Sequence, residues 1–75
     1  MKLPIISGQE LIKILVNNFG CQSEYGKGDH VKVFRNLTGK ILRTVVPLHR
    51  ELKKGTLLNV LKELEIKREE LQNYL

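Results

Sequence analysis

The clearest periodic pattern in the sequence lies near its beginning. Ser7 is a favoured helix N-cap residue, and Glu10 three positions later completes a capping box. Apolar residues then recur at helical spacing and form one stripe: Leu11, Ile12, Leu15, Val16 and Phe19. Gly20 follows, at a position where a left-handed C-cap favours glycine. The pattern predicts a helix over about residues 8–18.

From Cys21 onward the hydrophobic period shortens to that of β-strands. Residues 21–25 and 30–35 are predicted strands, joined by a loop in which Lys27 stands between two glycines. In the second strand Val31 and Val33 share one side, and three residues share the other: His30, Lys32 and Phe34. If helices cover the valines, His30 and Lys32 face outward. The outward position of Phe34 is explained only by an edge contact or a partner surface.

The rest of the chain predicts one more strand and two helices. Residues 36–39 have turn chemistry, and the β-branched run KILRTVV at residues 40–46 predicts a strand that ends at Pro47, which cannot donate to a ladder. Leucines at helical spacing predict a helix from residue 54 or 55 to residue 64, followed by a short helix over residues 68–75. The order predicts an α+β fold, α-β-β-β-α plus a short C-terminal helix, with helices packed on one face of a three-stranded antiparallel sheet.

Composition narrows the class of protein. The 75 residues fit one domain, and 41% hydrophobic with 28% charged residues is ordinary for a folded globule. Apolar runs are far shorter than the ~20 residues of a membrane span, and Pro4 interrupts the N-terminal segment. We therefore expect a cytoplasmic protein without a signal peptide. One cysteine and two histidines exclude a four-thiolate zinc site and argue against a structural metal, so no metal and no cofactor are expected.

Positive charge is concentrated in the middle of the chain. Residues 27–54 hold eight lysines and arginines against two acidic residues, whereas the remaining residues hold five basic and six acidic side chains. Segregated positive charge is typical of proteins that bind a polyanion, and nucleic acid is the leading candidate. A basic face that is merely solvated is the alternative. Only two Tyr and two Phe are present, so phosphate and shape, more than base stacking, are expected to carry RNA binding.

One candidate for chemistry is the triplet Gly28-Asp29-His30. A histidine has an unperturbed pKa near ~6.5 and exchanges protons at neutral pH. Metal-free RNA cleavage needs a base for the ribose 2′-hydroxyl proton and a cation beside the phosphorus centre. His30 with Lys27 or Lys32 supplies both. The alternative is that His30 is a polar surface residue at the start of a strand.

A second candidate is the start of the second predicted helix. Lys53, Lys54, Gly55 and Thr56 combine two cations, a glycine and a hydroxyl at a helix N-terminus, where free backbone N–H groups favour a phosphate. The alternative is that Gly55 and Thr56 only shape the helix start while the lysines are solvated. His49 is a proton donor, a phosphate contact or a turn residue. Cys21, with no histidine near it in sequence, reads as a small strand side chain and not as a nucleophile.

Several segments in order resemble a known family. They are LPIISGQEL at residues 3–11, KGDH at residues 27–30, VPLH at residues 46–49 and LKKGTL at residues 52–57. Together they closely resemble the HicA (YcfA-like) toxins of prokaryotic toxin–antitoxin pairs. The resemblance covers nearly the whole chain, and residues 66–71 match the terminal helix of the family.

The resemblance implies both a fold and a function. The fold is similar to a double-stranded-RNA-binding domain, and the function is that of an mRNA interferase, a metal-independent endoribonuclease held inactive by a HicB-type antitoxin. The essential histidine of the family corresponds to His30. Asp29 departs from the usual serine before it; an acid there either orients the imidazole or repels phosphate and lowers activity. Lys67 replaces a common serine cap, at some cost in local stability.

Two other functions remain open at this point. One is a non-catalytic RNA-binding module on the same fold, and the other is an interaction protein whose basic face meets an acidic protein. An antitoxin that silences a nuclease by covering its basic face is expected to shield His30.

Overall fold

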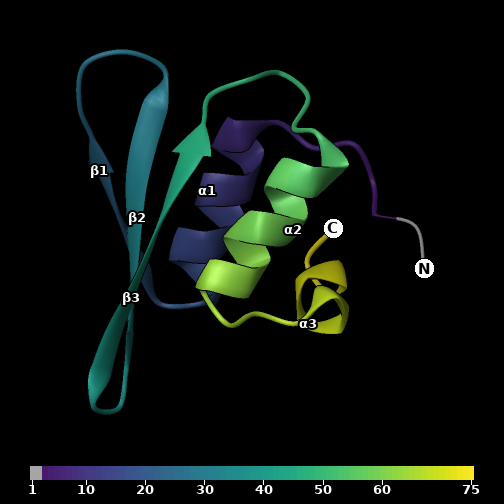
Figure 1. The fold of residues 1–75 in the computed structure, drawn as a ribbon. Coiled ribbons are helices and arrows are strands. Elements are labelled where there is room, and N and C mark those ends of the chain that lie inside the picture. Colours follow the sequence, from purple (N-terminus) through teal and green to yellow (C-terminus); the bar gives the residue numbers. More distant parts are fainter. Residues whose placement is uncertain (1–2) are drawn as a thin grey trace.

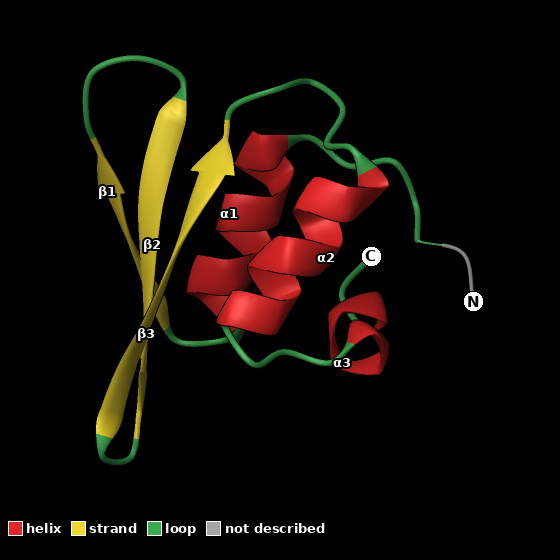
Figure 2. Cartoon of the chain, in the orientation of Figure 1, coloured by secondary structure: helices red, strands yellow, loops and turns green. Residues whose placement is uncertain are grey.

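Two helices pack against one face of a three-stranded sheet, and a third, short helix closes the open end of the core (Figures 1 and 2). The computed structural model describes residues 3–75. The element order is α1 (Gly8–Asn18), β1 (Cys21–Tyr25), β2 (His30–Leu37), β3 (Lys40–Pro47), α2 (Lys54–Glu63) and α3 (Arg68–Gln72). The α+β class and the predicted order of elements are confirmed.

The sheet is an antiparallel meander in the order β1-β2-β3, so β1 and β3 are its edges. The prediction that β2 ends at residue 35 was wrong, because its pairing with β3 continues to Leu37 opposite Lys40. A two-residue turn suffices to reverse the chain, since Gly39 adopts a positive φ of 82°. Pro47 extends β3 by one residue beyond the prediction, opposite His30.

Helix α1 begins as the sequence predicted. The Ser7 hydroxyl accepts a hydrogen bond from the backbone N–H of Glu10 at 3.0 Å, and the Glu10 carboxylate accepts one from the backbone N–H of Ser7 at 3.3 Å. This reciprocal capping box satisfies two of the donors that a helix N-terminus leaves free.

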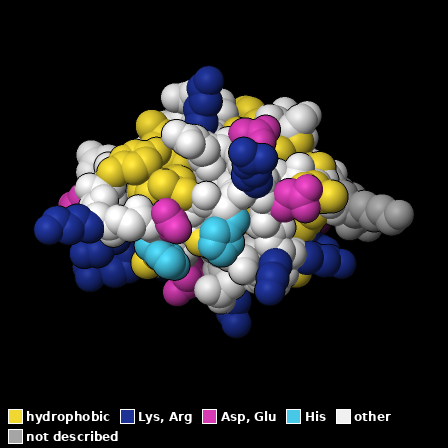
Figure 3. All heavy atoms as spheres, turned by 90° about the horizontal axis from the view of Figure 1, so that it is seen from above, with side chains coloured by type: hydrophobic (Ala, Val, Ile, Leu, Met, Phe, Trp, Pro, Cys, Tyr) yellow, Lys and Arg dark blue, Asp and Glu magenta, His cyan; other side chains and the backbone are white. Residues whose placement is uncertain are grey.

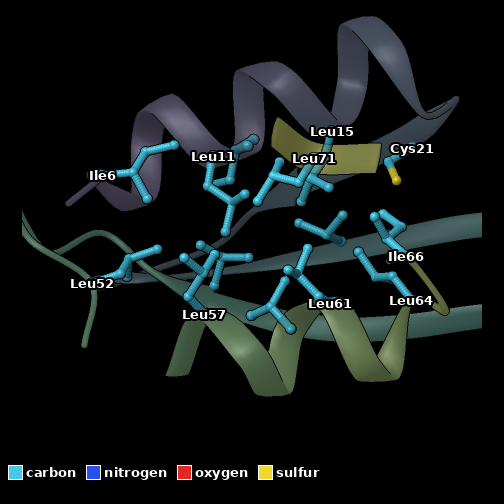
Figure 4. Close-up of a cluster of buried hydrophobic side chains, with 14 of the residues drawn as sticks. Ile6, Leu11, Leu15, Cys21, Leu52, Leu57, Leu61, Leu64, Ile66 and Leu71 are labelled. Atoms are coloured by element: carbon cyan, nitrogen blue, oxygen red, sulfur yellow. The ribbon is translucent and has the colours of Figure 1, made fainter. Parts of the chain in front are cut away.

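The core lies between the helices and the inner face of the sheet. Figure 4 shows leucines of α1 and α2 pointing toward one another, with Leu71 of α3 beside them. Val31 and Val33 are buried under the helices as predicted, at 1% and 0% exposure. The outer face of the sheet therefore carries the alternate residues of each strand.

The C-terminal helix is shorter than predicted. It ends at Gln72, and α2 ends at Glu63, after which Glu65 adopts a positive φ of 55°. Only Leu71 anchors α3 in the core, whereas Tyr74 and Leu75 are 47% and 49% exposed.

The N-cap residue of α3 is Lys67, where a serine would be a more favourable cap. The backbone N–H of Lys67 nevertheless donates to the Glu70 carboxylate at 3.0 Å. Half of a capping box therefore survives without a serine.

Candidate active site

His30 is exposed at the first position of β2, on the face of the sheet away from the helices. The loop before it passes through Gly28, whose φ of +91° is in the region that favours glycine. The turn at Gly28 and the alternation of β2 thus place the imidazole of His30 on the open face of the sheet, as the sequence predicted.

A groove of about 310 Å³ contains the imidazole, and we call it the His30 groove. It is lined by Glu24, Gly26, Lys27, His30, Lys32 and Val45. The structure therefore brings together His30 and both lysines that the sequence had associated with it. Within residues 3–75, none of the three side chains makes a hydrogen bond or an ion pair with another protein group.

Glu24 is a residue of this groove that the sequence analysis missed. It stands directly opposite Lys32 in the β1–β2 ladder. The register of the β1–β2 hairpin would have predicted this position of Glu24, because residues facing each other across a ladder project from the same side of the sheet. A carboxylate beside a proposed phosphate site lowers the net positive charge of the groove.

The loop that carries His49 is tied to the loop that carries His30. The backbone N–H of Leu48 donates to the carbonyl oxygen of Asp29 at 2.6 Å, and the N–H of Gly8 donates to the carbonyl oxygen of His49 at 2.9 Å. Figure 3, which views the molecule from above, shows both histidine side chains on the same face. Three segments distant in sequence therefore meet at the end of the molecule where His30 lies.

Gly8 allows this close approach. A Cβ on Gly8 would overlap the carbonyl oxygen of Pro47 and lie 2.9 Å from its carbonyl carbon and 3.2 Å from the Cα of Leu48. The sequence analysis assigned no separate role to Gly8. A glycine at the first position of a helix is a signal of close backbone approach, but nothing in the sequence names the segment that approaches.

Asp29 acts in this arrangement through its backbone. Within residues 3–75, no hydrogen bond joins its carboxylate to an imidazole, and its carbonyl oxygen holds the His49 loop through Leu48. The idea that this acid orients His30 by a hydrogen bond therefore finds no support in the geometry.

The start of α2 lies at the same end of the molecule as the start of β2 (Figure 1), but none of its residues lines the His30 groove. Lys53 is the N-cap and makes no side-chain capping bond, and Lys54 and Gly55 are exposed, while Thr56 is half-buried. No heavy atom beyond its neighbours lies within 4 Å of a Cβ built on Gly55. This turn is open to a ligand, and it is a separate surface from the one around His30.

Two of the eight basic residues of the central segment serve the fold. The Arg35 guanidinium donates to the carbonyl oxygens of Leu64 at 2.7 Å and Glu65 at 3.1 Å, and it lies 5.8 Å from the centroid of the Phe19 ring. Lys40 forms an ion pair with Glu65 at 2.6 Å. The sequence count therefore overstated the positive charge that is free to meet a polyanion.

Cys21 is buried at the start of β1, where burial raises the pKa of its thiol and the smaller effect of the Arg35 charge acts in the opposite direction. A raised pKa keeps the thiol protonated near neutrality, which agrees with a packing role. Within residues 3–75, no three His, Cys, Asp or Glu side chains lie together as metal ligands would. In the same part of the chain, no helix has the length and apolar character needed to cross a bilayer.

Comparison with known families decides the relationship of this chain. A family model described as the HicA toxin of bacterial toxin–antitoxin matches residues 8–66. The chain belongs to the HicA toxin family. The matched span runs from α1 to the segment after α2 and contains the His30 groove, the His49 loop and the start of α2. Membership of the HicA family implies an antitoxin as the kind of partner. Searches of curated proteins and of solved structures found no match.

Proposed function

We propose that this HicA-family chain is an mRNA interferase: an endoribonuclease that cuts messages in the cytoplasm without a metal ion and is neutralised by a HicB-type antitoxin. The observation that carries the proposal is the groove lined by Lys27, Lys32 and the exposed imidazole of His30, which has no partner among residues 3–75. Family membership supports a toxin, and the groove supplies the groups that phosphodiester cleavage requires.

The reaction starts with His30 as general base. Its imidazole takes the proton of a ribose 2′-hydroxyl, and the resulting oxygen attacks the adjacent phosphorus while the bond from phosphorus to the 5′ oxygen breaks. The products are a 2′,3′-cyclic phosphate and a 5′-hydroxyl. Lys27 and Lys32 stabilise the extra negative charge on the phosphoryl oxygens.

The leaving 5′ oxygen needs a proton, and we assign its donation to His49, the other imidazole on the same face (Figure 3). Its loop is held to the His30 loop by the bond from Leu48 to Asp29. Outside the groove, Lys53, Lys54, Gly55 and Thr56 at the start of α2 bind a backbone phosphate of the same RNA. Each group is thus assigned to a different part of one RNA strand.

The experiment that tests the cleavage compares the wild-type chain with His30→Ala. Inducible expression of wild type should arrest growth and fragment messages, and the purified protein should cut RNA in the presence of a metal chelator. Loss of the base should lower the cleavage rate about 10²–10⁴-fold. Lys13→Ala, which removes a cation from the exposed side of α1, is the control and should leave the rate unchanged. Cleavage by His30→Ala at near wild-type speed would refute the assigned role.

A non-catalytic RNA-binding module is the second candidate, and a specific observation favours it. Glu24 lines the groove and Asp29 precedes His30, so two acids stand near the position where the scissile phosphate would lie. Under this alternative the wild-type chain binds RNA and leaves it intact. Message integrity after expression of wild type separates the two functions.

The antitoxin is proposed to cover the His30 groove. An open groove with unpaired cations can be silenced by an acidic or strand-presenting partner, which removes both access and charge. Acylation of His30 by a histidine-selective reagent should be fast in the free toxin and at least tenfold slower in the complex. Equal rates would mean that inhibition works at another surface.

A further inference from the structure

The outer face of the sheet holds an aromatic ring that the core does not explain. Phe34 lies two residues beyond Lys32 on β2 and directly opposite Arg43 on β3, so these three side chains share the face. Phe34 is half-buried, and within residues 3–75 its ring stacks on no aromatic or cationic group. Val45, opposite Lys32 on the same face, is 47% exposed, so the ring is part of an apolar patch flanked by Lys32 and Arg43, an arrangement typical of a binding surface.

A hollow of about 420 Å³ surrounds this ring, and we call it the Phe34 hollow. Lys32, Phe34, Arg43 and Val45 line it from the sheet, and the side of α2 closes it beyond the free edge of β3. Its volume lies within the ~300–1,000 Å³ range of small-molecule sites. A planar ring can therefore enter it and lie against Phe34.

The wall formed by α2 is polar and held in place. The Glu63 Oε1 atom accepts hydrogen bonds from the Thr44 hydroxyl at 2.7 Å and from the Asn59 amide at 3.1 Å. Both bonds converge on one oxygen, which leaves acceptor capacity on the carboxylate and on the Asn59 carbonyl. The hollow thus combines an aromatic surface with acceptors at its rim, the two features that a nucleobase uses.

Two observations favour RNA over a protein as the occupant. Lys32 and Arg43 make no hydrogen bond or ion pair with another group of residues 3–75, so both charges are available to phosphates. The Phe34 hollow also shares Lys32 and Val45 with the His30 groove, so the two lie side by side. His30 and Phe34 are four positions apart on β2, a span of ~13 Å that a few nucleotides cover.

We propose that the Phe34 hollow binds one nucleobase of the single-stranded RNA whose backbone passes His30, with the base stacked on Phe34 and the flanking phosphates on Lys32 and Arg43. The inference rests on the proposed function, because the strand held here is the one presented to His30. It also revises the expectation that stacking plays little part: one ring placed next to the groove is enough to hold one base.

The test measures binding without cleavage. A labelled, fully 2′-O-methylated single-stranded oligonucleotide lacks the hydroxyl that cleavage needs, and its abasic counterpart of equal length lacks the bases. Wild type should bind the base-bearing strand roughly 5- to 150-fold more tightly than the abasic strand, the range expected for stacking of a single base. Phe34→Leu and Phe34→Ala should lose that preference, and Phe34→Tyr, which keeps the ring, should retain it.

Ile41→Ala is the matched control, because Ile41 is exposed and apolar on the same face but does not line the hollow. It should bind both strands as wild type does, and circular dichroism should show that each variant is folded. Equal binding of base-bearing and abasic strands by wild type would overturn the inference even if every Phe34 variant failed to fold. So would RNA binding that is unchanged in Phe34→Leu while antitoxin binding is lost, since a protein would then occupy the hollow.

The cleavage assay with His30→Ala fails or succeeds independently of this result. Cleavage that depends on His30, with binding indifferent to the ring, would overturn the inference and leave the proposed function standing. Ring-dependent binding by a chain that never cuts RNA would refute the nuclease and leave the base site in place.

Discussion

Gly8→Ala is the substitution for which local sequence preference and tertiary structure predict opposite signs. Gly8 is the first residue of α1, and alanine is the better helix former by up to ~1 kcal/mol. Propensity alone therefore predicts an unchanged or more stable protein. The packing of Gly8 against the β3–α2 loop predicts the reverse.

The magnitude follows from the contacts. A new Cβ would overlap the carbonyl oxygen of Pro47, and the atoms it meets belong to the backbone, so relief requires a shift of the main chain. Overpacking of this kind costs about 1–3 kcal/mol. Loss of the hydrogen bond from the N–H of Gly8 to the carbonyl oxygen of His49 adds about 0.5–1.5 kcal/mol. After the gain in propensity, the free energy of unfolding should fall by roughly 1–4 kcal/mol.

The assay is urea denaturation followed by circular dichroism, with Gly55→Ala as the control. Gly55 is in the first turn of α2, its φ is not positive, and no heavy atom beyond its neighbours lies within 4 Å of its Cβ position. Gly55→Ala should be neutral or more stable by up to ~1 kcal/mol. A Gly8→Ala protein at least as stable as wild type would refute the packing argument. Its cleavage rate should also fall, because the displaced loop carries His49.

Two further predictions concern buried groups. Arg35→Met keeps most of the aliphatic bulk but leaves the carbonyl oxygens of Leu64 and Glu65 without their donor, so the free energy of unfolding should drop by about 1.5–3 kcal/mol. The control is Lys40→Met, which removes only an exposed ion pair and should change the free energy of unfolding by less than ~1 kcal/mol. Equal losses in the two variants would contradict the argument. The Cys21 thiol should resist alkylation in the native protein at pH 7–8 and react once urea unfolds it. Because burial raises the pKa of the Cys21 thiol above the ordinary 9.0, folding favours the neutral thiol, so the free energy of unfolding should decline as the pH rises above about 9. Cys21→Ser should remove this part of the pH dependence. A native protein that is alkylated as fast as the unfolded chain would contradict the burial of Cys21.

The local elements of this fold could be predicted because their signals are contiguous. The capping box of α1 lies within four residues, and the alternation of valines with polar residues along β2 states which side is buried. The boundaries were less predictable. The end of β2 depends on its partner strand, and the end of α3 depends on how far the core extends beyond Leu71.

The candidate site shows the same division. The sequence identified His30, Lys27 and Lys32 as a group because they are neighbours in the chain, and the groove brings them together. Glu24 escaped notice because it joins the group through a cross-strand pair. The sequence gives the total positive charge of the middle segment but not which charges are exposed. Arg35 turns inward and binds the carbonyl oxygen of Leu64 at the end of α2.

Three things follow from the sequence alone: the order and type of the elements, the inward and outward sides of the strands, and the relationship to the HicA toxins. All three depend on residue spacing along the chain. Only the tertiary structure decides that the His49 loop is bonded to the His30 loop, that Gly8 must be a glycine for that loop to close, and that the Phe34 hollow opens beside the groove. The physical reason is that each of these features is a contact between segments far apart in the sequence. Such contacts form where packing and backbone hydrogen bonding bring those segments together. Residue spacing along the chain does not predict which distant segments will meet.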